Sequence, residues 1–208
     1  PVMELEIHPT EHDLIIATHG RGIYIIDDLT PIRQLTPELL EQELVFLDSR
    51  PFRLGYTGGE QRMEGDDEFT GDNPTDVCLI TYYLKKRHVF GDMFIEVYDE
   101  NDSLIEKLSA GTRKGINRVP WVTVMDPPRV PSSVQLLGQA LTGPTLPPGD
   151  YRVKISKGDA AYEGNVTMIW DPASRHSAED RDMRQAQLMK AYGMLEELDP
   201  HSVYIEPQ

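Results

Sequence analysis

The stretch DLIIATHGRGIYIIDD, residues 13–28, places two apolar runs on either side of Gly20-Arg21-Gly22. Both runs are rich in β-favouring residues, and the two glycines allow a tight turn between them. Just upstream, VMELEIHP alternates apolar and acidic residues, which is the period of a half-buried strand. Residues 1–28 are therefore expected to form a three-stranded antiparallel meander. A sheet this small cannot bury its own apolar residues, so it must pack against something else.

The segment after the hairpin no longer shows the apolar, β-favouring runs of residues 1–28. Residues 29–43 predict a connector with one short helix, in which Thr36 is the N-cap and Pro37 lies in the first turn. The next run, LVFLDSRPF, predicts a strand that ends at Pro51. A Gly-rich, acidic loop is expected over residues 55–76 because this stretch has no periodicity and few apolar residues.

Six further β segments follow at regular spacing, separated by turn residues such as Asp99-Glu100-Asn101-Asp102. Short strands punctuated in this way indicate a β-sandwich, which we assign to residues 44–172. A Pro-rich excursion containing VQLLGQAL is expected to add an edge strand. The six segments are VCLITYYL (77–84), MFIEVYD (93–99), SLIEKL (103–108), NRVPWVTV (117–124), DYRVKI (150–155) and NVTMIW (165–170).

The last part of the chain, residues 173–208, predicts a helix and a tail. Ser177 followed by Asp180 is similar to a capping box, and the helix is expected to run to Leu198 before Pro200. Within it Leu188, Tyr192 and Leu195 share one face.

The composition narrows the classes of function. The 208 residues carry a formal net charge of −15, which repels phosphate backbones and anionic membrane surfaces and argues against nucleic acid as a partner. No apolar stretch approaches the roughly 20 residues that cross a bilayer, so no membrane insertion is expected. The single cysteine, Cys78, lies in an apolar run and is expected to be buried. A start at Pro1 without an initiator Met suggests a fragment of a longer chain or a processed form.

Several of these segments resemble a known family. DLIIATHGRGIYIIDDLTPIRQL is similar to the final blade and exit linker of bacterial BNR/Asp-box, sortilin-like β-propeller proteins, which often carry the label glycosyl hydrolase. The downstream pattern resembles the immunoglobulin-like module that follows such propellers, and also the module of flagellar hook-capping proteins. The segments that carry this second resemblance are GDNP (71–74), ITYYLK (80–85), IEVYDENDSLIEKL (95–108), GINRVPW (115–121) and LPPGDYRVKI (146–155).

The resemblance implies a fold and a setting. It implies a mainly β chain, in which an immunoglobulin- or fibronectin-III-like β-sandwich follows a meander left from a propeller blade and precedes a C-terminal α-helix. It also implies an exported bacterial protein at an extracellular, periplasmic or cell-surface location. Two departures are visible: Asn101-Asp102 replaces the usual glycine of a turn, and the Asp-box repeat is absent, so no ligand surface of the propeller can be assigned to this chain.

Two polar clusters are candidate sites. His19 and Arg21 flank a glycine and could hold an anion, but they are expected to serve the turn and neighbouring loops. The acidic loop could bind Ca²⁺, although it lacks the spacing of an EF-hand, so a solvated loop is expected and no metal or cofactor is assigned. The carboxylates considered for calcium are Asp66, Asp67, Glu68 and Asp72.

Four aromatic residues could form a sugar-stacking platform, although aromatic residues in strands more often belong to a core. Trp121 is expected to be the central core residue. The four are Tyr82, Trp121, Tyr151 and Trp170.

These features predict a non-catalytic accessory module that braces an upstream propeller of the same protein and mediates protein contacts. Self-association through residues 13–28 is expected as well, since the hairpin would otherwise expose apolar surface. The alternative is a carbohydrate-binding module with a polysaccharide ligand. A hydrolase domain ranks third, because no set of nucleophile, base and orienting residue is visible.

Overall fold

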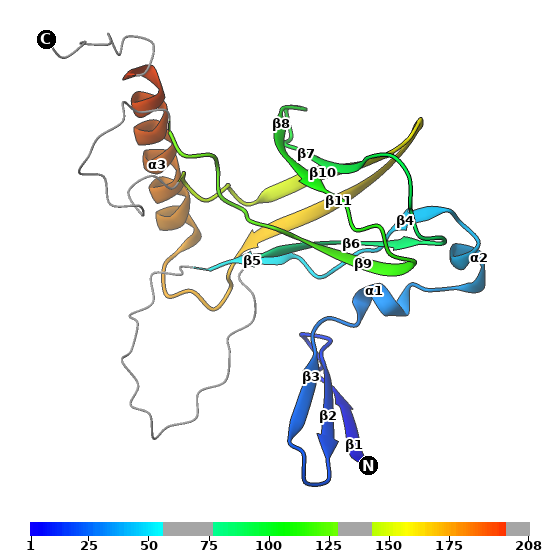
Figure 1. Ribbon diagram of the computed structural model, residues 1–208. Helices are drawn as coiled ribbons and strands as arrows, with labels where there is room; N and C mark the ends of the chain where they lie inside the picture. Colours follow the sequence, from blue (N-terminus) through cyan, green and yellow to red (C-terminus); the bar gives the residue numbers. More distant parts are fainter. Residues whose placement is uncertain (56–76, 129–142, 199–208) are drawn as a thin grey trace, which may run out of the picture. The chain divides into compact units, whose positions relative to one another are not determined.

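The structure is a computed structural model that describes residues 1–55, 77–128 and 143–198. Its described part is mainly β, with a C-terminal helix (Figure 1). The described residues divide into two compact units. The first holds residues 1–53, 77–121 and 149–169, and the second holds residues 54–55, 122–128, 143–148 and 170–198.

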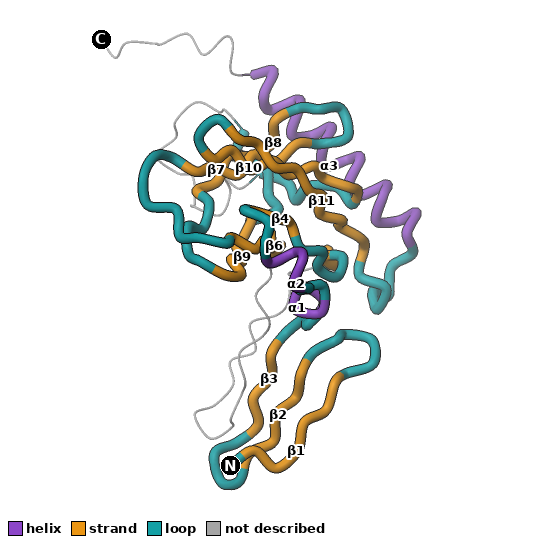
Figure 2. The backbone as a smooth tube through the Cα atoms, turned by 90° about the vertical axis from the view of Figure 1, so that its right-hand side faces the viewer, coloured by secondary structure: helices purple, strands orange, loops and turns teal. Residues whose placement is uncertain are grey.

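The predicted meander is present as a three-stranded antiparallel sheet in the order β1-β2-β3. Its strands are β1 (Val2–Ile7), β2 (Leu14–Thr18) and β3 (Ile23–Ile26), and Figure 2 shows them as neighbouring strands joined by loops. The turn between β2 and β3 uses Gly20 and Gly22, both at positive φ, as the sequence indicated.

Two short helices follow the meander where the sequence predicted one. The predicted helix is α2 (Pro37–Leu40), and the side chain of Thr36 accepts a hydrogen bond from the Leu39 amide as its N-cap. The additional helix is α1 (Thr30–Arg33), whose first turn contains Pro31.

Two further sheets lie in the first unit. One has three strands in the order β4-β6-β9, and the other has five strands in the order β5-β11-β10-β7-β8. Their bounds are β4 (Leu44–Phe46), β5 (Phe52–Leu54), β6 (Cys78–Leu84), β7 (Met93–Tyr98), β8 (Leu104–Ser109), β9 (Gly115–Trp121), β10 (Gly149–Lys157) and β11 (Ala160–Trp170).

The prediction of one strand over LVFLDSRPF was wrong. The segment forms β4 and β5, which belong to different sheets, and residues 47–51 cross between them. The crossing is held by hydrogen bonds rather than by a ladder: the Leu47 amide donates to the Thr81 carbonyl, and the Asp48 amide donates to the Gln34 side chain. Pro51 has no amide hydrogen to offer to a sheet at this point.

The core of the first unit is formed by inward-facing side chains of both larger sheets. Every second residue of β7 and of β9 is buried, as the period of a strand requires. The expectation for Trp121 is confirmed: it is 1% exposed, and its ring meets that of Tyr151 edge to face at 5.3 Å. Phe46 packs against Gly164, where a side chain would have no room.

The C-terminal helix α3 (Ala178–Leu198) begins where the sequence predicted. The Ser177 hydroxyl donates to the Asp180 carboxylate and accepts from the Asp180 amide, so Asp replaces Glu in a capping box. Leu188 and Tyr192 are half-buried, whereas Leu195 is exposed. The expected edge strand in VQLLGQAL and Pro200 lie outside the described residues.

Candidate functional site

The meander presents one face that is apolar on all three strands. Because directly paired residues of neighbouring strands share a face, the register places Leu5, Ile16 and Tyr24 together in one row. A second row on the same side completes what we call the apolar face, defined by Leu5, Ile7, Leu14, Ile16, Tyr24 and Ile26.

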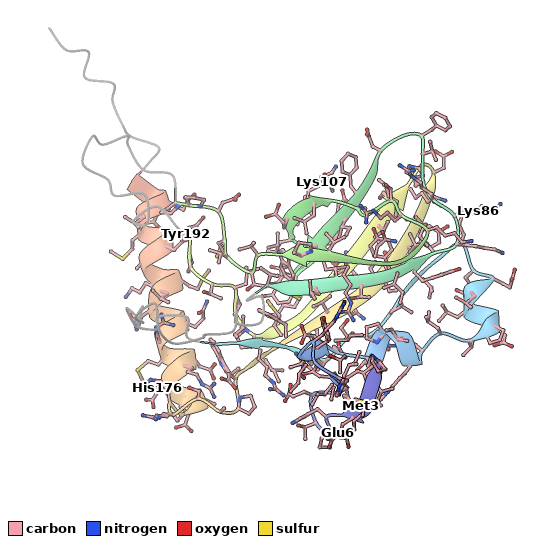
Figure 3. The ribbon with its side chains drawn as sticks, turned by 60° about the horizontal axis from the view of Figure 1, so that its bottom comes forward. Met3, Glu6, Lys86, Lys107, His176 and Tyr192 are labelled. Atoms are coloured by element: carbon pink, nitrogen blue, oxygen red, sulfur yellow. The ribbon has the colours of Figure 1, made fainter. Side chains whose placement is uncertain are left out.

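The opposite side, which we call the mixed face, is apolar except along β1. Ile15 and Ile25 pair across the sheet, and the next residue of that row is Glu6. Figure 3 labels Met3 and Glu6 on this strand. The mixed face consists of Glu4, Glu6, Ile15, Ala17, Ile23 and Ile25.

Both faces are open to solvent in this chain. The large apolar residues of β1 and β3 are between 42% and 70% exposed, whereas residues of this kind are normally buried. Both β1 and β3 are also edge strands within the described residues. Exposure of apolar side chains and of unpaired strand edges to water is unfavourable. A small sheet that is apolar on both faces and has open edges is therefore a surface for interaction with a partner.

The turn between β2 and β3 forms a shallow open hollow of about 430 Å³. The Thr18 hydroxyl donates to the Gly22 carbonyl at 2.7 Å and fixes the turn. His19 and Arg21 are exposed beside it, so an anion could reach them. The residues that line the hollow are Pro1, Val2, Thr18, His19, Arg21 and Tyr24.

A polar joint connects the end of the meander to the rest of the first unit, and Asp28 is its centre. Asp28 is buried, has φ of 49°, and its carboxylate accepts hydrogen bonds from the amides of Thr30 and Arg50, both at 3.0 Å. Its own amide donates to the Asp13 carboxylate at 2.9 Å. Arg118, on β9, donates to the Asp28 carbonyl at 2.8 Å. The joint thus ties together segments about ninety residues apart.

The environment of Asp28 favours its charged form. Burial by itself would raise the pKa of this carboxyl, but the hydrogen bonds from Thr30 and from the Arg50 amide, with the Arg50 charge, outweigh it and lower the pKa. Asp tolerates the left-handed backbone that the position requires.

Ion pairs reinforce the joint. Glu11 lies between two arginines, with its carboxylate oxygens 2.7 Å from Arg50 Nη1 and 2.9 Å from Arg53 Nη2. Sequence reasoning missed these residues and Arg118 because the partners come from separate elements. The adjacent Asp27-Asp28 at the end of the hairpin was the one local signal, and it does not distinguish the buried aspartate from the exposed one.

Three of the four proposed sugar-stacking residues lie in the core. Tyr82, Trp121 and Tyr151 are buried, so the faces of their rings are not accessible to a sugar. Burial raises the pKa of Tyr82 and of Tyr151 to about 12, as expected for phenols in an apolar setting. These side chains stabilise the fold.

Trp170 belongs to the second unit and is half-buried. Its indole N–H donates to the Asp182 carboxylate at 2.9 Å, and the Arg181 guanidinium lies 5.5 Å from the ring centroid. Both partners are on α3, so this residue anchors the start of the helix and does not form a platform with the other aromatics.

Metal-binding and membrane-spanning features are the remaining candidates. The calcium candidates Asp66, Asp67, Glu68 and Asp72 lie outside the described residues. Within residues 1–55, 77–128 and 143–198, no group of three or more His, Cys, Asp or Glu side chains is placed to hold a metal ion. Among the helices that the structure describes, none has the length and apolar character needed to cross a bilayer.

Comparison of the chain with protein-family models, with curated proteins and with solved structures found no match.

Proposed function

We propose that this chain is a non-catalytic accessory and interaction module, and that its meander completes a larger β structure. The observation that carries the proposal is the exposure of the meander on both faces. An enzyme site would instead require convergent polar groups in a cleft. The hollow at the meander is open, and its lining comes from Pro1, β1, the end of β2, the turn after it and β3.

The resemblance to BNR/Asp-box, sortilin-like proteins suggests the partner. In a propeller each blade is covered by its neighbours on both faces, which would account for a sheet that is apolar on both sides. On this proposal, residues 1–28 complete the last blade of an upstream propeller, the two larger sheets form an immunoglobulin-like sandwich that braces it, and the protein is exported.

The polar joint supports a bracing role. A module that braces a neighbour must hold a fixed direction relative to it, and a flexible linker does not do so. Here the connector is tied by part-buried hydrogen bonds to Asp28 and by the Glu11 ion pairs. The hydrogen bond from Arg118 to the Asp28 carbonyl also links the end of the meander to β9.

The experiment that tests the proposal is reconstitution. This chain and the polypeptide encoded directly upstream of it are produced separately, mixed, and followed by size-exclusion chromatography with hydrogen exchange of β1–β3. We expect a complex in which the amides of β3 become protected, and loss of the complex for Ile25→Lys. Leu104→Lys, which changes an exposed apolar residue of β8, is the matched control.

Two results would contradict the proposal. One is that the two polypeptides do not associate, and the other is micromolar binding of this chain to members of a polysaccharide panel, which would favour the carbohydrate-binding alternative.

A further inference from the structure

Two loops at one end of the first unit are joined to each other. The loop between β6 and β7 spans residues 85–92, and the loop between β8 and β9 spans residues 110–114. The His88 amide donates to the Thr112 carbonyl at 3.0 Å. The two loops therefore form one surface, which we call the cationic tip, defined by Lys86, Arg87, Val89, Phe90, Arg113 and Lys114.

The apex of the tip is apolar and exposed. Phe90 is 87% exposed and Val89 is 65% exposed. The loop is nevertheless fixed: His88 Nε2 lies 3.0 Å from the Gly91 carbonyl oxygen, and Gly91 turns the chain at φ of 81°. These contacts hold the loop in one conformation while Val89 and Phe90 are exposed to water. Little conformational entropy would therefore be lost when a partner binds to the loop.

Positive charge surrounds this apex. Lys86, Arg87, Arg113 and Lys114 are all exposed, and among the described residues no carboxylate lies within 4.0 Å of their charged nitrogens. Figure 3 shows Lys86 projecting away from the strands.

The acidic residues of the same end offset only part of this charge. Glu41 is paired with Lys85, and Glu43 is paired with Lys157. Glu43 also acts electrostatically on Lys86, and Asp92 and Asp159 lie in the turns that precede β7 and β11. The tip is thus positive on a chain whose net charge is −15.

We propose that the cationic tip is a contact site for an anionic lipid surface. Lys and Arg would lie at the level of the lipid phosphates while Val89 and Phe90 enter the boundary between headgroups and acyl chains. The tip combines exposed basic side chains with exposed Val89 and Phe90, and a bilayer with anionic headgroups above an apolar interior complements both. The negative charge elsewhere is screened beyond a Debye length of about 8 Å at physiological ionic strength.

The test is co-sedimentation of the full chain with vesicles of phosphatidylcholine alone and of equal parts phosphatidylcholine and phosphatidylglycerol. We expect binding to the anionic vesicles only, weaker at high salt. Phe90→Ser and Arg87→Glu should each lower the vesicle partition coefficient about tenfold. Both residues are exposed, so circular dichroism should show unchanged folding.

Matched controls separate the tip from other surfaces. Leu104→Ser removes an exposed apolar residue at the opposite end of the five-stranded sheet, and Arg175→Glu makes the same charge change outside the tip. Neither should alter binding. Tyr24→Lys tests whether the meander binds lipid instead.

Three results would overturn the proposal. The first is equal binding of the chain to both vesicle types. The second is vesicle binding that is lost with Tyr24→Lys but kept with Phe90→Ser. The third is binding of the chain to polyglutamate that equals its binding to vesicles and does not depend on Phe90. The last result would indicate an acidic protein as the partner. None of these outcomes bears on reconstitution with the upstream polypeptide, so the two proposals can fail separately.

Discussion

Asp28 shows how one residue can link the end of a sheet to a distant strand by hydrogen bonds. It is adjacent to Asp27 in the sequence, yet Asp27 is exposed and Asp28 is buried among donors. The difference arises from the left-handed backbone at Asp28, which turns its carboxylate toward the amides of Thr30 and Arg50. The two neighbours therefore form a natural pair for mutation.

The pair gives a prediction with a defined pH dependence. Asp28→Asn should lower the free energy of unfolding by about 1–2 kcal/mol at neutral pH, since an amide cannot accept both backbone hydrogen bonds. The folded-state pKa of Asp28 is lowered from 3.8, so its contribution is present above that value and is lost as pH falls through the lower folded pKa. The difference between wild type and variant should thus vanish in acid.

Urea denaturation at neutral pH and at a pH below the lowered folded-state pKa of Asp28 measures this difference. Asp27→Asn makes the same charge change at an exposed site and should leave stability within about 0.5 kcal/mol of wild type. An Asp28→Asn variant that is as stable as Asp27→Asn at neutral pH would show that the joint does not contribute.

At the scale of elements, the meander differs from the strands of the two larger sheets. The strands β6 and β7 bury most of their apolar residues, whereas β1 and β3 leave theirs exposed. The two faces of the meander are also unequal, because Glu4 and Glu6 place charge on the mixed face alone. Without another partner, copies of the chain should meet through the apolar face.

Tyr24 and Ile25 test this inequality because they are adjacent on β3, point to opposite faces and are 54% and 59% exposed. We expect the average mass of the wild-type chain in sedimentation equilibrium to rise with concentration. Tyr24→Lys should abolish the rise, because it places charge on the apolar face. Ile25→Lys should reduce it less, since the mixed face already carries acidic residues.

Circular dichroism of both variants checks that β structure is retained. A wild-type chain that stays monomeric at all concentrations, or two variants with equal effects, would contradict the assignment of the apolar face as the contact.

At the scale of the whole molecule, Cys78 reports on opening of the core. It is the single cysteine of the chain, lies on β6 and is buried, and burial raises the pKa of its thiol to about 12. Because the thiolate is the reactive species, we expect labelling by a disulfide reagent at neutral pH to be slow and to follow unfolding of the sheets.

The measurement compares the labelling rate in buffer with the rate in increasing urea. The unfolded chain in strong denaturant is the control and should react rapidly, since an ordinary cysteine has a pKa near 8.5. If the native chain were labelled completely and as fast as the unfolded chain, Cys78 on β6 would be accessible to the reagent and not buried.

Local chemistry was sufficient to predict most elements of this protein. Strand alternation marked β1, Gly20 and Gly22 marked the hairpin turn, and Thr36 and Ser177 marked the starts of α2 and α3. Each of these signals lies within a few residues of the structure that it specifies, so a linear reading can find it.

Only the tertiary structure decided which distant groups meet. It divided the run after residue 43 into β4 and β5 of different sheets, brought Arg118 to Asp28, and joined His88 to Thr112 at the cationic tip. It also buried Tyr82 while leaving Tyr24 exposed. These outcomes depend on how strands pair and sheets pack over long sequence separations, and neither periodicity nor turn chemistry carries that information.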